Sequence, residues 1–171
     1  MVKVAINGFG RIGKLVFRAI IEKNLKNVQI VAINELGSLE SSLHLVNFDS
    51  THGELKTKLY KSNKGIKYNN KNIIFCSERD PAKLPWKKLG VDVVLECSGV
   101  FTSKEKSQSH IIAGAKKVII SAPAKDVDAT IVQGVNNNIL NKKHNIISNG
   151  SCTTNCLAPV AMVLDKVLGI E

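Results

Sequence analysis

The feature that most constrains the fold is a glycine-rich turn close to the N-terminus. A short β-prone run, residues 2–7, leads into Gly8, Gly10 and Gly13, and an apolar stripe of helical spacing follows over residues 14–23. Glycines at this spacing allow a tight turn, a close approach of the backbone to a phosphate, and close packing of a helix on a strand. The pattern therefore predicts a strand–turn–helix unit with an anion site at the start of the helix.

An acidic residue stands at the second position that such a unit requires. The nearly continuous apolar run 28–33 predicts a parallel strand covered on both faces, and Glu35 follows it about 20 residues after the glycine turn. A carboxylate there can accept hydrogen bonds from ribose hydroxyls, and Leu36 beside it offers no positive charge to a 2′-phosphate. The pattern favours NAD over NADP. A purely structural glycine turn and a solvated Glu35 remain the alternatives.

The rest of the chain alternates strand and helix patterns. Ser38 is a plausible N-cap for a short helix. We expect antiparallel hairpins within residues 55–75, strands at 91–95, 117–120, 129–132 and 145–148, and helices at 38–46, 103–113 and 157–168. This order predicts an α/β fold of the Rossmann type, a doubly wound, mostly parallel sheet with an inserted antiparallel hairpin region. Ligands of such sheets bind beyond the carboxyl ends of the strands.

Small, polar or acidic residues follow several predicted strands at that edge. Among them are Ser98 with Gly99, Ser121, and Cys152 after the turn that begins at Ser148. A thiol near a helix N-terminus faces unpaired N–H groups and the positive end of the helix dipole, which favour the nucleophilic thiolate. A small, inert buried cysteine is the alternative.

Composition limits the other classes of function. The chain has 24 Lys and Arg against 14 Asp and Glu, a net charge of +10, but the lysines are scattered and no aromatic stacking platform accompanies them. Nucleic-acid binding is therefore not expected as the main role. The four cysteines show no paired metal-ligand spacing, so no metal site is expected. No signal peptide or membrane-length apolar run is recognised, and we expect a cytoplasmic protein with reduced thiols.

Several segments together resemble the phosphorylating glyceraldehyde-3-phosphate dehydrogenase family. They are Ala5 to Gly13, Ser121-Ala122-Pro123, Gly134-Val135-Asn136, and Ser148 to Pro159 with its specific Ser-Cys-Thr-Thr-Asn-Cys sequence. The resemblance runs the whole length of the chain. It implies a glycolytic, homotetrameric enzyme that oxidises glyceraldehyde 3-phosphate, a triose phosphate, with NAD and inorganic phosphate to 1,3-bisphosphoglycerate.

The resemblance also assigns roles position by position. It implies that Cys152 is the nucleophile, which carries the substrate as a thioester, and that Ser151 and Thr153 contact substrate or inorganic phosphate. The residues it places against the cofactor are Asn7, Gly8, Gly10, Arg11, Ile12, Gly13, Glu35, Arg79, Ser98, Gly99 and Ser121. From spacing alone, Arg79 could instead pair with Glu78 or Asp80 on the surface. Cys156 would have a buried structural role.

Two departures from the family pattern bear on specificity and on the nucleophile. Glu35 stands where the family usually has aspartate, and Asn34-Glu35-Leu36 is reminiscent of the sister enzyme, erythrose-4-phosphate dehydrogenase, which remains an alternative. Gly150 replaces the usual alanine before Ser151 and Cys152, which could loosen that turn.

The resemblance also predicts the division of the chain. Residues 1–150 would be the NAD-binding domain and residues 151–171 the first helix of the catalytic domain. The family's chain is about twice as long, and its general-base histidine lies beyond Glu171. We therefore expect the 171-residue chain itself to bind NAD but hardly to turn over. A stand-alone dinucleotide or nucleic-acid binding module is the remaining alternative.

Overall fold

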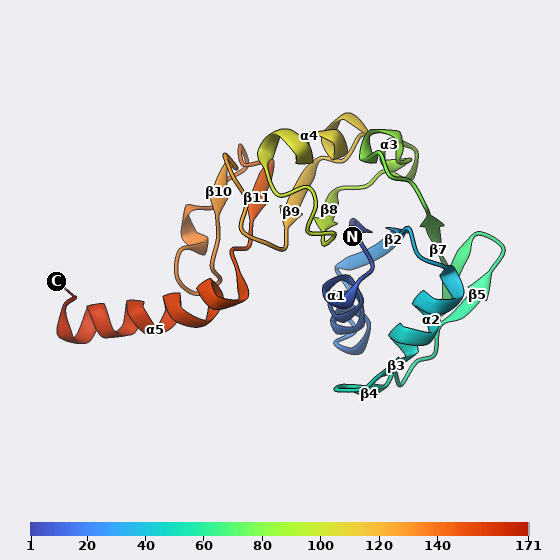
Figure 1. Cartoon of the computed structure of the whole chain (residues 1–171), viewed down its shortest axis with the longest axis horizontal. Coiled ribbons are helices and arrows are strands. Elements are labelled where there is room, and N and C mark those ends of the chain that lie inside the picture. The colour runs from blue at the N-terminus through green and yellow to red at the C-terminus, as the bar shows by residue number, and fades with distance from the viewer. Residues whose placement is uncertain (171) are drawn as a thin grey trace.

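A nine-stranded sheet organises the computed structural model, which describes residues 1–170 (Figure 1). The strand order is β10-β11-β9-β8-β1-β2-β7-β6-β5. The parallel strands are β1 (Val2–Asn7), β2 (Val28–Asn34), β7 (Lys71–Cys76), β8 (Val93–Glu96), β9 (Lys117–Ile120), β10 (Ala129–Thr130) and β11 (Ile146–Ser148). Strands β5 (Tyr60–Ser62) and β6 (Gly65–Tyr68) extend one edge as an antiparallel hairpin.

Helices α1 (Arg11–Glu22), α2 (Leu39–Asn47), α3 (Trp86–Leu89) and α4 (Lys104–Ile112) lie between strands in the chain and cover both faces of the sheet, with 3₁₀ turns η1 (Pro81–Lys83) and η2 (Asn137–Ile139). Helix α5 (Cys152–Leu168) follows the last strand. Strands β3 (Phe48–Asp49) and β4 (Gly53–Glu54) form a separate two-stranded sheet. Among the described residues, no helix is both long and apolar enough to span a membrane.

The chain changes direction across the sheet next to β1. Strands β2 and β7 lie on one side of β1, and β8, β9 and β11 continue on the other side. The crossing between β1 and β8 is the topological switch point, where doubly wound sheets bind their ligands. The predicted fold class is therefore confirmed, including the antiparallel hairpin.

Two apolar clusters lie on opposite faces of the sheet and hold the strand ends in place. Ile6 and Phe17 belong to the cluster that includes α1 and α2, whereas Ala5 and Trp86 belong to the cluster on the side of α3 and α4. Neighbouring residues of β1 thus enter different clusters, as the two-residue period of a strand requires. Burial on both faces explains why β1 and β2 are nearly continuous apolar runs.

Helix α1 begins at Arg11 and α5 at Cys152, as the glycine turn and the turn after Ser148 predicted, although the apolar stripe of each helix starts only after its first turn. The strand expected at 129–132 has only Ala129 and Thr130. Ser38 caps α2, as predicted, by accepting a hydrogen bond from the Ser41 amide at 3.1 Å.

Helix α5 projects away from the sheet and carries no buried residue (Figure 1). Its large apolar side chains are exposed, among them Leu157, Val163 and Val167. The expectation that Cys156 is buried is wrong for this chain, because no other described element covers the helix face on which it lies.

Candidate functional site

The glycine turn has a separate reason for each of its glycines. Gly8 has a φ of 86°, and a Cβ there would lie 2.5 Å from the Ser98 backbone. A Cβ on Gly13 would lie 2.2 Å from the Gly8 carbonyl oxygen, so helix α1 can approach β1 only without one. Gly10 differs, because a Cβ there would meet nothing within 4 Å and its φ of −71° suits any residue. The protein's own packing therefore does not require glycine at position 10, and the open space is available to a ligand.

The first turn of α1 presents backbone N–H groups to the same space. Gly10 is the N-cap and makes no side-chain capping bond, and no acidic residue stands in the first turn. The Arg11 guanidinium turns away, donating to Asp49 at 2.9 Å and to Thr51 at 3.3 Å. Arg11 and Ile12 therefore offer their amides rather than a side-chain charge, in the arrangement that binds phosphate groups at helix N-termini.

Glu35 joins the second strand to the glycine turn. Its Oε2 accepts the Phe9 amide at 2.6 Å and its Oε1 accepts the Gly37 amide at 3.0 Å. Burial lowers the pKa of nearby Lys14, and the Glu35 charge partly opposes that shift. A carboxylate has about four lone-pair positions, so Glu35 can still accept hydrogen bonds from a ligand hydroxyl.

A groove of about 400 Å³ lies between these elements. Six predicted site residues line it: Asn7, Gly8, Gly10, Glu35, Arg79 and Ser98. The other lining residues are Asn34, Leu36, Glu78, Cys97, Val100 and Phe101. Arg79 is exposed on this wall. The surface alternative required an ion pair with Glu78 or Asp80, and within residues 1–170 Arg79 forms neither.

The groove fits a dinucleotide in three respects. Gly10 lines it with an unfilled Cβ position, the N-terminal amides of α1 follow Gly10 directly in the chain, and one wall carries a carboxylate with free acceptor capacity. Leu36 is 51% exposed beside Glu35 and provides no cation for a further phosphate.

The remaining predicted residues lie outside the groove, along the same edge of the sheet. Gly99, with a φ of 74°, follows Ser98, and its Cβ position is also open. Ser121 follows β9 and donates its amide to the Glu96 carbonyl at 3.0 Å. Because β9 lies between β8 and β11, a ligand that extends from the glycine turn to Cys152 must pass Ser98 and Ser121.

Cys152 is the first residue of α5 and follows a turn that hydrogen bonds hold in place. Ser151 caps the helix by accepting the Thr154 amide at 2.9 Å, and its hydroxyl also meets that of Thr153 at 2.8 Å. Gly150 has a φ of 69°, a conformation that alanine adopts only with strain, and its amide bonds to the Ser148 hydroxyl at 3.0 Å. Glycine adopts this conformation without strain, and the loosening of the turn at Gly150 stays a prediction.

The four thiols differ in their surroundings. All are free; Cys152 and Cys156 are exposed, and Cys76 and Cys97 are partly buried. Burial raises the pKa of Cys97 to about 11, against a smaller lowering effect of Ser121, and burial also raises that of Cys76. In the described part of the chain, no group of three or more His, Cys, Asp or Glu side chains could hold a metal ion.

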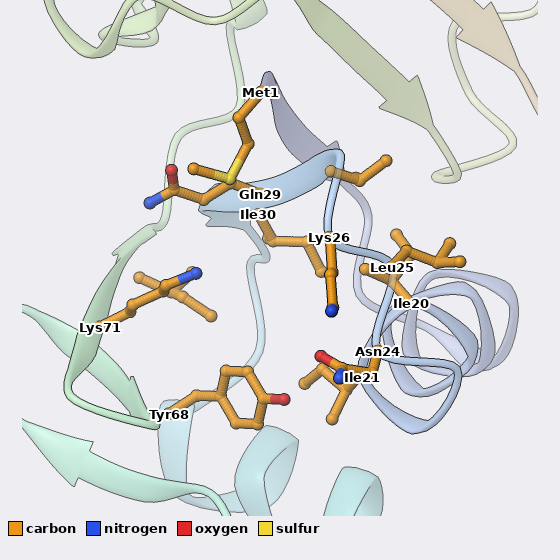
Figure 2. Close-up of a pocket in the computed structure, with 12 residues that line it drawn as sticks. Met1, Ile20, Ile21, Asn24, Leu25, Lys26, Gln29, Ile30, Tyr68 and Lys71 are labelled. Carbon is orange, nitrogen blue, oxygen red and sulfur yellow. The ribbon is translucent and has the colours of Figure 1, made fainter.

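A second cavity, of about 310 Å³, lies at the opposite ends of the strands (Figure 2). Tyr68 and Lys71 face it from the hairpin side, and Ile21 and Asn24 from the end of α1. It contains none of the predicted site residues and no helix N-terminus. Six of the predicted residues instead line the groove at the switch point of the sheet.

Comparisons with known proteins identify the family of the chain. Residues 2–104 match the model of the family described as glyceraldehyde 3-phosphate dehydrogenase, NAD binding domain. Glyceraldehyde-3-phosphate dehydrogenases of Xanthobacter flavus and Zymomonas mobilis are 52% and 53% identical, each over 170 residues. That of Pseudomonas aeruginosa is 51% identical over 171 residues.

These alignments cover 99% of this chain but only 50–51% of each relative. The chain thus spans about half the length of the curated relatives it matches. The family model covers more than half of the chain and its NAD-binding description agrees with the groove, so NAD is the cofactor. The chain belongs to the glyceraldehyde-3-phosphate dehydrogenase family and contains its NAD-binding domain.

Proposed function

We propose that this chain is the NAD-binding part of an enzyme that oxidises glyceraldehyde 3-phosphate, with inorganic phosphate, to 1,3-bisphosphoglycerate. The observation that carries the proposal is the order of the strands. This order places the glycine turn, Ser98, Ser121 and Cys152 one after another along one edge of the sheet, so that an extended cofactor would meet them in turn.

Each end of the groove has a role in holding the cofactor. The amides of Arg11 and Ile12 bind the pyrophosphate, while Glu35 and Arg79 hold the adenosine end. The open positions at Gly10 and Gly99 admit the cofactor close to the backbone. NAD supplies the hydride acceptor of the oxidation when it is bound.

Cys152 performs the covalent chemistry. Its thiolate attacks the aldehyde carbon and forms a thiohemiacetal, whose oxidation by loss of a hydride leaves a thioester on the sulfur. An oxygen of inorganic phosphate then attacks the thioester carbonyl, the carbon–sulfur bond breaks, and the thiolate of Cys152 is restored. Ser151 and Thr153, whose hydroxyls lie beside Cys152 at the start of α5, contact substrate or phosphate.

The wider assignments extend this proposal from the family resemblance. The enzyme acts in glycolysis, is located in the cytoplasm and assembles as a homotetramer. Residues 1–150 form the NAD-binding domain, and residues 151–171 begin the catalytic domain at the helix that carries the nucleophile.

Selective alkylation tests the role of Cys152. Iodoacetamide should modify Cys152 faster than Cys156, its exposed matched control one turn further along α5, because only Cys152 occupies the helix N-terminus. Cys97 should react slowest, since burial raises its pKa to about 11 and leaves little thiolate at pH 8. Peptide mass spectrometry at short reaction times measures all four rates. Equal rates at Cys152 and Cys156 would contradict the proposed activation.

A further inference from the structure

A buried carboxylate beneath the groove has no place in the function described so far. Glu96 ends β8 directly beside Asn7 of β1, and its side chain is fully buried. It does not line the groove, so it cannot touch a ligand there. A buried carboxylate is costly unless its lone pairs are all engaged, and Glu96 meets that condition.

Four donors surround the Glu96 carboxylate. Oε2 accepts the Asn7 amide group at 2.6 Å and faces His110 Nε2 at 2.9 Å. Oε1 accepts the backbone N–H of Ser98 at 2.8 Å and also the Ser98 hydroxyl. A carboxylate is the only side-chain group that accepts at every position, so no neutral residue of similar shape satisfies all of these donors.

Trp86 fixes the proton of His110. The indole Nε1–H can only donate, and it lies 3.1 Å from His110 Nδ1, which must therefore accept. The imidazole is then neutral with its proton on Nε2, where it donates to Glu96. Trp86, His110 and Glu96 thus form a buried hydrogen-bond series in which Trp86 donates to His110 and His110 donates to Glu96.

The chain of hydrogen bonds continues to the other wall of the groove. Because Asn7 donates to Glu96, its carbonyl oxygen accepts from Asn34 at 2.7 Å. Asn34 in turn binds the backbone of Glu78 through both of its side-chain atoms, at 2.8 and 2.9 Å. Glu78 precedes Arg79, so this link sets the position of the segment that carries Arg79 into the groove.

On the near wall, the same carboxylate sets the loop after β8. The Ser98 hydroxyl donates to Glu96 and accepts the Val100 amide at 3.1 Å. The loop between them contains Gly99 in its left-handed conformation. Both walls are therefore held through one buried group.

We propose that Glu96 is a positioning residue for the NAD site, which orients Asn7 and Ser98 and through them both walls of the groove, with His110 and Trp86 fixing its donors. The inference rests on the proposal that this groove holds NAD. Neither Glu96 nor His110 touches the cofactor; both act through the groups that do.

The test measures NAD affinity by calorimetry in variants of the whole chain. Glu96→Gln keeps the shape but turns an NH₂ group toward donors, so it should weaken NAD binding by about tenfold or more, the effect of losing a hydrogen bond to a charged group. His110→Phe should also weaken binding, whereas His110→Gln, which retains both a donor and an acceptor, should restore most of it. The single tryptophan supplies a spectroscopic signature, because its indole N–H resonance should shift in Glu96→Gln.

A matched control separates positioning from general destabilisation. Asn47 is buried and makes two hydrogen bonds to the Leu59 backbone, away from the groove, so Asn47→Ser should lower the melting temperature and leave NAD affinity unchanged. Wild-type NAD affinity in a folded Glu96→Gln would overturn the inference. If Glu96→Gln does not fold, equal affinities of His110→Phe and His110→Gln would overturn it. Failure of the wild-type chain itself to bind NAD would instead overturn the proposed site.

Discussion

The three glycines of the turn differ in whether the protein's own packing requires them or leaves space for a ligand. Gly8 and Gly13 are required because a Cβ at either would collide with backbone, while the position of a Cβ on Gly10 is empty. The spacing predicted a tight turn at Gly8, a close backbone approach at Gly10 and close helix packing at Gly13, and the three Cβ positions agree with these reasons. The sequence contains no information on which atoms of Ser98 or Gly8 lie opposite a given Cβ.

We predict opposite outcomes for alanine at two of these positions. Gly10→Ala should leave the free energy of unfolding within about 0.5 kcal/mol of wild type, since the methyl meets no protein atom, yet weaken NAD binding by about tenfold or more. Gly13→Ala should destabilise the fold by about 1–3 kcal/mol through overpacking. Urea unfolding and NAD titration of both variants measure this. A Gly10→Ala variant with full affinity would show that the ligand does not approach this position.

The buried groups around Glu96 were not predicted, although they carry a sequence signal. A glutamate ends the apolar run 91–95, and a histidine lies in the helix pattern 103–113. Neither residue alone indicates a partner. Their pairing depends on how α4 packs against the sheet, which places His110 Nε2 2.9 Å from Glu96 Oε2 and is set by the tertiary fold.

At the scale of elements, helix α5 differs from the other helices. Helices α1 to α4 each contain buried residues, whereas α5 contains none among its described residues and exposes a row of apolar side chains. Such a surface is typical of a face that packs on another structure. Periodicity predicted the helix from its apolar residues, but periodicity alone reports an apolar face without reporting what covers it.

Two leucines provide a matched test of that difference in the 171-residue chain. Leu164 on α5 is 46% exposed, so Leu164→Ala should change the free energy of unfolding by no more than about 0.5 kcal/mol. Leu59 is 3% exposed within the core cluster, so Leu59→Ala should cost about 2–5 kcal/mol. Denaturant unfolding of both variants decides the matter. A large loss in Leu164→Ala would mean that α5 is packed in solution.

At the scale of the whole molecule, the doubly wound sheet was predictable because strand and helix patterns alternate clearly along the chain. The strand order was less so. Residues of β10 and β11 pair only over 129–130 and 147–148, and such short pairings leave a weak pattern in sequence. The convergence of Ser98, Ser121 and Cys152 at one edge nevertheless followed from the parallel arrangement, because every parallel strand ends at the same side.

The stability of the whole chain should depend on pH through Asp128. A hydrogen bond from Lys104 at 2.6 Å, aided by the amides of Ile146 and Asn145, lowers the pKa of Asp128 to about 2. The folded state therefore binds this proton less tightly than the unfolded chain does, in which the pKa of Asp is about 3.9. The resulting stabilisation is present above about pH 4 and is lost as the pH falls toward 2.

Asp128→Asn should accordingly be less stable than wild type at pH 7, and the difference should shrink as the pH falls below 4. Urea unfolding at a series of pH values measures the two free energies. A difference that stays constant down to the acid limit would mean that the charge of Asp128 does not contribute.

The central claim is that one extended ligand runs along the strand ends from Glu35 to Cys152. A crystal structure of the chain with NAD tests it most directly. We predict the pyrophosphate on the amides of Arg11 and Ile12, the adenosine between Glu35 and Arg79, and the nicotinamide beyond β9 toward Cys152. NAD bound in the reverse direction, or in the cavity beside Tyr68 and Lys71, would contradict the account.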